Sequence, residues 1–280
     1  MPQNPFPDSV EKQALRRRDA IFLEEFRSRT LAKGLSYCGL TSAEFRDIQA
    51  WRPQLSAVHA VEIDQRVLNN MDINWRRLKL GIPLQIVPAD ILEYLRSSTT
   101  GCFEVYNLDF YGGFTNPKHD GTSRCREAMR SLASHHREQQ RSFVVIATFN
   151  VRDRGVEQYD AFINEVRSAL DGFNNVEANL KAHAKSHATK IKLSYMYACW
   201  QAGVANDFDV EFEDPFVYNS GATTLVHFCA VFIYRATALA TPHADKDSLI
   251  AIANRPLKRM DGRIARVDVR PALISRPQKL

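Results

Sequence analysis

The sequence lacks the paired cysteines that disulfide frameworks and cysteine zinc sites require. It has five cysteines, an odd number, and no two of them form a Cys-x-x-Cys pair. They are scattered along the chain as Cys38, Cys102, Cys125, Cys199 and Cys229. This usage argues against a disulfide-stapled extracellular protein and predicts a reducing, cytoplasmic setting, in which most of these thiols act as small buried hydrophobes.

Long apolar runs are also missing. No stretch approaches the roughly 20 apolar residues that a membrane-spanning helix requires. Residues 1–8 are rich in proline and polar side chains, unlike a secretory signal. The content of 45% hydrophobic and 25% charged residues is ordinary for a globular protein. We therefore expect a soluble intracellular protein.

Several catalytic and metal-binding signatures are absent as well. The chain has no Gly-x-Ser-x-Gly motif and no Walker-type phosphate loop. His183 and His187 have the four-residue spacing of a helical metal pair, but lysines surround them and no metal-motif glutamate follows. We interpret this segment as a solvated basic face, and we expect His135 and His136 to lie at the surface. No metal site is predicted.

Positive charge is concentrated near the C-terminus. Residues 245–280 contain nine Lys or Arg against four Asp, a surplus equal to the net charge of +5 of the whole chain. Phosphate backbones attract such a segment. RNA or DNA is therefore a candidate partner of this basic extension, with solvated surface as the plain alternative.

Apolar runs alternate with amphipathic stretches in the order typical of a parallel α/β protein. Strands are predicted at residues 35–39, 57–63, 84–87, 103–109, 142–148, 208–217 and 223–234. Helices are predicted at residues 9–30, from Thr41 or Ser42 to 51, 65–78, 91–97, 124–139, 156–170, 175–200 and 247–254. The short turn at 218–221 makes the last two strands antiparallel. We expect a helical extension at 1–34, a Rossmann-like α/β domain at 35–240 and a basic extension at 241–280.

Acidic residues follow three consecutive strands. They are Glu62, Asp90 and Asp109. Because the carboxyl ends of parallel strands border one crevice, these carboxylates are expected around a shared ligand site. Glu62 suits a ribose diol and Asp90 an adenine amino group, whereas Asp109 would face a reacting group. The plain alternative for each is a loop carboxylate that caps the following helix.

Two motifs carry a resemblance to a known family. The first strand and turn, residues 35–41, read Leu-Ser-Tyr-Cys-Gly-Leu-Thr, and residues 103–112 read Phe-Glu-Val-Tyr-Asn-Leu-Asp-Phe-Tyr-Gly. They resemble Leu-Ser-Ala-Ser-Gly-Leu-Arg and Phe-Asp-Val-Val-Asp-Ile-Asp-Pro-Phe-Gly of tRNA guanine dimethyltransferases. The chain thus resembles class I S-adenosylmethionine-dependent methyltransferases, whose core is a mainly parallel seven-stranded sheet with a reversed final hairpin.

The resemblance implies S-adenosylmethionine as cofactor and methyl transfer to a nitrogen of a nucleic-acid base. The implied cofactor-binding residues are Tyr37, Cys38, Gly39, Leu40, Thr41, Glu62, Ile63, Asp90 and Ile91. The implied catalytic residues are Asn107, Asp109, Phe110 and Tyr111, which would orient and stack on the target base.

Two alternatives remain open. In the family motifs, small residues stand where this chain has Tyr37 and Cys38, and an acid and a proline stand where it has Asn107 and Phe110. The departure in the first turn, at Tyr37 and Cys38, motivates the first alternative, a methyltransferase-like binding or scaffold protein without catalysis. The second is a methyltransferase that acts on a small molecule or a protein.

Overall fold

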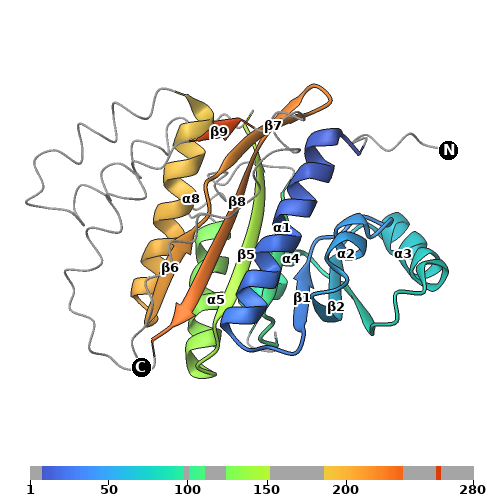
Figure 1. The fold of residues 1–280 in the computed structure, drawn as a ribbon, viewed down its shortest axis with the longest axis horizontal. Helices are drawn as coiled ribbons and strands as arrows, with labels where there is room; N and C mark the ends of the chain where they lie inside the picture. Colours follow the sequence, from blue (N-terminus) through green and yellow to red (C-terminus); the bar gives the residue numbers. More distant parts are fainter. Residues whose placement is uncertain (1–7, 98–100, 111–123, 152–185, 236–256, 260–280) are drawn as a thin grey trace, which may run out of the picture.

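The computed structural model describes residues 8–97, 101–110, 124–151, 186–235 and 257–259 (Figure 1). One mixed sheet runs through them, with helices on both of its faces. None of the helices in these ranges is both long and apolar enough to span a bilayer. Tyr111, His183, the predicted helices at 156–170 and 247–254, and the first part of the one at 175–200 lie outside the described residues.

Five parallel strands form one half of the sheet in the order β3-β2-β1-β4-β5. Their bounds are β1 Leu35–Gly39, β2 Leu55–Glu62, β3 Leu84–Pro88, β4 Val105–Asp109 and β5 Phe143–Asn150. The chain order reverses between β1 and β4, which pair in parallel through Tyr37–Val105 and Gly39–Asn107. Such a reversal is where α/β sheets place their ligands, at the carboxyl ends of the strands.

Antiparallel strands complete the sheet. β8 (Thr223–Tyr234) pairs with the whole length of β5, and both β6 (Phe208–Phe212) and β7 (Phe216–Ser220) pair with β8. A short β9 (Lys258–Arg259) pairs with β7. The predicted Rossmann-like fold, a mainly parallel sheet ending in an antiparallel hairpin, is confirmed.

The single strand predicted at 208–217 is wrong, because the structure divides it into β6 and β7. The break covers Glu213, Asp214 and Pro215. Proline has no N–H to donate to a ladder, so a strand commonly breaks or bulges there. The β7–β8 turn is also shorter than predicted, since β7 continues to Ser220 and only Gly221 and Ala222 form the turn. Gly221 has φ +60°, which glycine adopts without strain.

Six helices are described: α1 Val10–Arg29, α2 Arg46–Trp51, α3 Gln65–Leu78, α4 Ile91–Arg96, α5 Arg124–Glu138 and α8 His187–Val204. Side-chain caps begin four of them, from Ser9, Asp64, Asp90 and Ser186. Their side-chain oxygens accept hydrogen bonds from backbone N–H groups that have no partner within the helix. The helix predicted to end at 200 continues to Val204.

The start predicted for the second helix, at Thr41 or Ser42, is wrong. Residues 42–45 form a turn, in which Phe45 N–H donates to the Ser42 carbonyl at 2.9 Å, and α2 begins at Arg46. Phe45 adopts φ +52° and is fully buried, with its ring edge-on to Trp75 at 5.0 Å between centroids. Burial of the Phe45 ring therefore outweighs the tendency of Thr41 or Ser42 to cap a helix, and the helix starts later than predicted.

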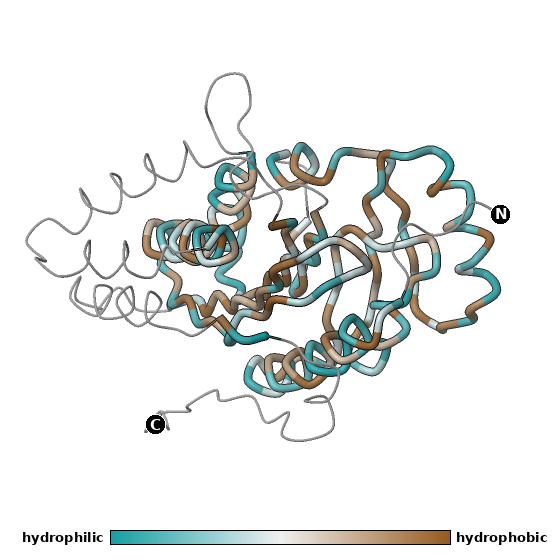
Figure 2. The backbone as a smooth tube through the Cα atoms, turned by 90° about the horizontal axis from the view of Figure 1, so that it is seen from above, coloured by the Kyte–Doolittle hydropathy of each residue, from teal (hydrophilic) through white to brown (hydrophobic). Residues whose placement is uncertain are grey.

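Helices lie on both sides of the sheet (Figure 2), and the buried side chains form two hydrophobic layers, one on each face. Residues of α1, α2 and α3 pack on one face, and residues of α4, α5 and α8 pack on the other. Successive residues of a strand alternate between these layers, so that Tyr37 belongs to the first and Cys38 to the second.

The surface position predicted for His136 is wrong. The residue is 1% exposed, and its ring stacks on Phe143 with centroids 4.1 Å apart. Its Nδ1 lies 3.1 Å from the Arg141 carbonyl and its Nε2 lies 2.9 Å from the Tyr106 hydroxyl. Both ring nitrogens therefore have partners, which makes an imidazole tolerable in the core.

Candidate functional site

The C-terminal ends of four parallel strands lie side by side along one edge of the sheet, in the order β3, β2, β1 and β4. Asp90 follows β3, Glu62 ends β2, Gly39 ends β1 and Asp109 ends β4. The predicted site residues are thus brought to one edge of the sheet, on both sides of the point where the strand order reverses.

Glu62 and Ile63 lie at the C-terminal end of β2, the second strand in this order. Glu62 Oε1 accepts the backbone N–H groups of Ile63, at 2.7 Å, and Asp64, at 2.8 Å. Within the described part of the chain, no hydrogen bond or ion pair uses the other carboxylate oxygen, Oε2. Ile63 is 69% exposed, an unusual degree for a large aliphatic side chain. A fixed carboxylate beside an exposed apolar side chain can hold a diol and an adjoining flat ring.

Asp90 and Ile91 lie at the start of α4. Asp90 Oδ1 accepts the N–H groups of Leu92 and Glu93 at 2.9 and 3.1 Å, and it lies 2.8 Å from an Arg124 guanidinium nitrogen. This carboxylate therefore caps its helix, the plain alternative stated for it. Ile91 is 6% exposed and belongs to the core. A role of Asp90 toward adenine stays a prediction.

The turn after β1 is closely packed. Tyr37 and Cys38 are fully buried, and the Tyr37 hydroxyl donates to the Leu40 carbonyl at 3.0 Å. Thr41 is 5% exposed, whereas Leu40 is partly buried. The side chains of Tyr37 and Cys38 therefore pack in the two hydrophobic layers of the core. It is the backbone of the turn that is left to contact a ligand.

Gly39 is required by a close contact between two strands. A Cβ at this position would lie 2.2 Å from the carbonyl oxygen and 2.8 Å from the nitrogen of Asn107. The Leu40 N–H continues this contact by donating to the Asn107 carbonyl at 2.9 Å. The glycine therefore lets β1 and β4 approach each other at the predicted cofactor edge.

Asn107 lies in a polar group that the sequence did not indicate. It is 4% exposed, and its Nδ2 donates to Asp47 Oδ2 at 3.3 Å and to the Leu40 carbonyl at 3.4 Å. The other oxygen of Asp47 accepts from Nε of Arg16. Helices α1 and α2 thereby place an arginine and a carboxylate beside the end of β4. No spacing in the sequence relates residues 16, 47 and 107, so only the packed structure could find this group.

Asp109 is the exposed residue of β4, at the end where the strand leaves the sheet. Surrounding protein nevertheless removes part of its hydration, and this desolvation raises the pKa of its carboxyl. The charge of Lys12 opposes the rise and the charge of Asp47 adds to it. A weakly hydrated carboxylate is a strong hydrogen-bond acceptor for an incoming N–H group.

Phe110 follows Asp109 and is held in place. Its N–H donates to the Thr148 carbonyl at 2.9 Å, and its ring stacks on Phe149 with centroids 5.4 Å apart and planes inclined by 21°. One face of the Phe110 ring is therefore covered by protein. Tyr111, the other aromatic residue predicted here, lies outside the described residues.

The basic C-terminal segment is described at Leu257, Lys258 and Arg259. Lys258 Nζ lies 2.6 Å from an Asp214 carboxylate oxygen, and Arg259 is exposed. These two cations stand on β9, at the far edge of the sheet from β3. The binding of RNA or DNA by this segment stays a prediction.

No protein-family model and no curated protein sequence matches the chain. Solved structures do resemble it. Trm1 from Pyrococcus horikoshii, in complex with S-adenosyl-L-methionine, is 10% identical with a TM-score of 0.50, covering 84% of this chain and 58% of that protein. The methyltransferase domain of bacterial CtHen1-C is 11% identical with a TM-score of 0.44, covering 79% of this chain and all of that domain. Ribosomal protein L11 methylase from Lactobacillus delbrueckii subsp. bulgaricus is 13% identical with a TM-score of 0.37, covering 78% of each chain.

The likeness to Trm1 concerns the fold, and this chain spans little more than half of that protein's length. This chain itself shows the reversal of strand order between β1 and β4 and the antiparallel end of the sheet. The chain therefore has the Rossmann-like fold of class I methyltransferases.

Proposed function

We propose that this chain binds S-adenosylmethionine at the carboxyl edge of the sheet and transfers its methyl group to a nitrogen of a nucleic-acid base. The observation that carries the proposal is the pair Glu62 and Ile63. The carboxylate is fixed through Oε1, while Ile63 is 69% exposed beside it. Glu62 Oε2 accepts a ribose hydroxyl, and Ile63 covers one face of the adenine.

The cofactor supplies a methyl group on a sulfonium centre. A nitrogen lone pair forms the new N–C bond as the S–C bond breaks, and the nitrogen then loses a proton. Catalysis of such a transfer depends on alignment of the reacting atoms. Asp109 accepts a hydrogen bond from the amine N–H and later receives its proton. Asn107 keeps the end of β4 in position through Asp47.

A base as the methyl acceptor is supported by the residues around this edge. The positive charge of Lys12 acts on Asp109, and a lysine at this place can attract a phosphate-bearing substrate. Phe110 presents an aromatic ring directly after Asp109, and bases stack on such rings. A base within a duplex must first be flipped out of its stack.

Calorimetric titration with S-adenosylmethionine tests the cofactor site. Wild-type protein is expected to bind one equivalent, and Glu62→Gln to bind at least about tenfold more weakly, since a hydrogen bond to a charged group contributes roughly 1.5–3 kcal/mol. Glu104→Gln is the matched control. Glu104 also accepts a backbone N–H, from Ser36 at 2.7 Å, but it precedes β4 and lies at the opposite edge. Absence of binding by the wild-type protein would favour the scaffold alternative.

The methyl acceptor is tested separately. Protein and isotopically labelled S-adenosylmethionine are incubated with RNA, DNA, a protein extract and a metabolite extract, and digested nucleosides are analysed by mass spectrometry. We expect label on a base nitrogen, and Asp109→Asn to lower the rate by about 10²–10⁴-fold while cofactor binding persists. Label in the protein or metabolite fraction alone would overturn the assignment to a base.

A further inference from the structure

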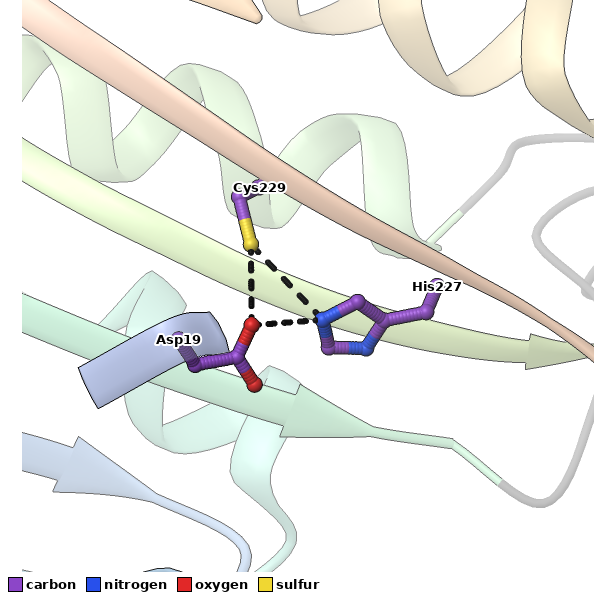
Figure 3. Close-up of side chains that lie close together, drawn as sticks. All are labelled: Asp19, His227 and Cys229. Carbon is purple, nitrogen blue, oxygen red and sulfur yellow. Dashed lines mark hydrogen bonds and ion pairs between the residues drawn. The ribbon is translucent and has the colours of Figure 1, made fainter. Parts of the chain in front are cut away.

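Three buried side chains meet on the face of the sheet that α1 covers (Figure 3). Asp19 comes from α1, and His227 and Cys229 come from β8. Asp19 Oδ1 lies 3.0 Å from His227 Nε2 and 3.4 Å from Cys229 Sγ, and the sulfur lies 3.6 Å from the same nitrogen. The three ligand-type atoms therefore form a triangle with nearly equal sides.

Rigid elements hold this triangle. His227 and Cys229 are two residues apart on a strand, so their side chains point to the same face of the sheet. Asp19 lies in the middle of α1, 208 positions from His227 in the sequence. The residues are 2%, 5% and 1% exposed, in the order Asp19, His227 and Cys229. The three ligand-type atoms are therefore held close together by buried side chains, which are less mobile than side chains at the surface.

Thr148 supports the imidazole from the neighbouring strand. It lies opposite His227 in the β5–β8 ladder, and its Oγ1 is 3.1 Å from His227 Nδ1. When Nδ1 donates its proton to this hydroxyl, the lone pair of Nε2 points at Asp19 and Cys229. Histidine ligands of metals are commonly oriented in this way by a partner on the other ring nitrogen.

The dimensions suit a small divalent cation. Ligand distances of about 2.0 Å for oxygen, 2.05 Å for nitrogen and 2.3 Å for sulfur, in tetrahedral geometry, place these atoms roughly 3.3 Å (O–N), 3.5 Å (O–S) and 3.6 Å (N–S) apart. The observed separations are 3.0, 3.4 and 3.6 Å. One carboxylate and one thiolate also balance the charge of a divalent ion, which matters at a buried position.

We propose that Asp19, His227 and Cys229 form a binding site for one divalent cation of the zinc class. Binding replaces the thiol proton of Cys229, which leaves to solvent, and the imidazole binds in its neutral form. The fourth coordination position is taken by water. Because the ligands come from α1 and β8, the ion fastens the first helix to the sheet. The proposal does not rest on the methyl transfer proposed above, although Thr148, the partner of His227, also lies opposite Asp109 in the β4–β5 ladder.

Cobalt titration of the full-length protein tests the site. Co²⁺ is expected to bind one per chain and to produce a thiolate-to-cobalt charge-transfer band in the near ultraviolet. Zn²⁺ is expected to abolish this band and to raise the melting temperature of the protein. A hydrogen-bonded cluster without a metal would give neither the band nor a shift, and this result with the wild-type protein alone would overturn the proposal.

Variants assign the ligands. Cys229→Ser is expected to abolish the charge-transfer band, whereas Cys199→Ser, which changes an equally buried thiol on α8, is expected to retain it. Thr148→Val is expected to lower the affinity for Co²⁺ about tenfold, as loss of a partner of a ligand does. A band that persists in Cys229→Ser would contradict the proposal. If that variant does not fold, Asp19→Asn provides the same test through a loss of affinity of tenfold or more.

Discussion

Gly39 of β1 lies against the backbone of Asn107 of β4 with no room for another carbon atom. A Cβ at Gly39 would meet the Asn107 carbonyl oxygen at 2.2 Å. This contact joins the first and fourth strands at the point where the sheet order reverses. The glycine at the centre of the predicted cofactor turn is thus explained by strand packing, independently of any ligand.

Gly39→Ala is expected to destabilise the protein by about 1–3 kcal/mol, because neither backbone can move without disturbing the ladder. Denaturant unfolding followed by circular dichroism measures the change. Gly101→Ala is the control, since a Cβ there would only touch the Phe103 ring at 3.5 Å. Equal stability of Gly39→Ala and the wild type would show that the two strands can separate at little cost.

Arg18 of α1 and Glu213 form a buried ion pair, with exposures of 9% and 7%. The guanidinium carbon also lies 4.3 Å from the centroid of the Phe216 ring. Arg18→Met is expected to cost about 3–5 kcal/mol of unfolding free energy, because it removes the guanidinium that pairs with this buried carboxylate. Chemical denaturation of the single variants and of the double variant Arg18→Met/Glu213→Leu measures the coupling.

The double variant is expected to recover most of the lost stability, since neither position then carries a buried charge. Asp72→Asn is the exposed control. Asp72 pairs with Arg76 on α3, but the side chains are 55% and 77% exposed. This control is expected to change stability by less than about 1 kcal/mol. A double variant as unstable as Arg18→Met would indicate that the arginine acts through packing.

His136 makes stability depend on pH. Desolvation by burial lowers the pKa of this imidazole from 6.5 to about 3 in the folded state. Between these values the unfolded chain binds a proton that the native protein excludes, so stability falls as the pH falls. The contribution of His136 to the free energy of unfolding is fully present above pH 6.5, and it decreases by about 1.4 kcal/mol per pH unit below that value.

His136→Asn is expected to reduce the slope of unfolding free energy against pH between about pH 6 and 4 by that amount. Tyr106→Phe removes the hydroxyl that contacts His136 Nε2 but leaves the imidazole in place. It is therefore expected to lower stability while the slope persists. An unchanged slope in His136→Asn would mean that this residue is protonated without unfolding.

Burial predicts which thiols react. Cys38, Cys199 and Cys229 are fully or nearly fully buried, and desolvation raises the pKa of Cys199 to about 12. When no metal is bound, such thiols carry little thiolate, the reactive form, at neutral pH. Cys102 and Cys125 are only partly buried. A chromogenic disulfide reagent is expected to modify at most these two rapidly in the native protein, and all five after denaturation. Fast modification of three or more native thiols would contradict the packing of the core.

The proposed role of Asp109 predicts a pH effect on methyl transfer. Desolvation raises the pKa of its carboxyl above the ordinary value of 3.8, and only the ionised form accepts a proton from the amine. The rate is therefore expected to fall as the pH is lowered through an apparent pKa above 3.8. Asp109→Asn should remove this dependence along with most of the rate. An acid limb of the same position in Asp109→Asn would assign the titration to another group.

Local features of the chain were predictable from the sequence. Apolar runs located β1 to β5 and β8 to within a few residues. Asp64 and Asp90 begin α3 and α4 with capping hydrogen bonds, which for Asp90 was the alternative to a role in ligand binding. The short turn at Gly221 made the last hairpin antiparallel. These predictions succeed because strand periodicity, capping and tight turns depend on neighbouring residues.

Long-range packing decided the rest. Burial of Phe45 moved the start of α2, and a partner on each ring nitrogen placed His136 in the core. Hydrogen bonds join residues that are 60 to 210 positions apart in the sequence, namely Asp47 to Asn107 and Asp19 to His227 and Cys229. No local pattern encodes such pairs, because they exist only once the helices cover the sheet. By itself the sequence determined the order and type of most of the described elements and the carboxylates at the strand ends. Only the tertiary structure decided which polar side chains are buried together, since burial is a property of the whole packed chain.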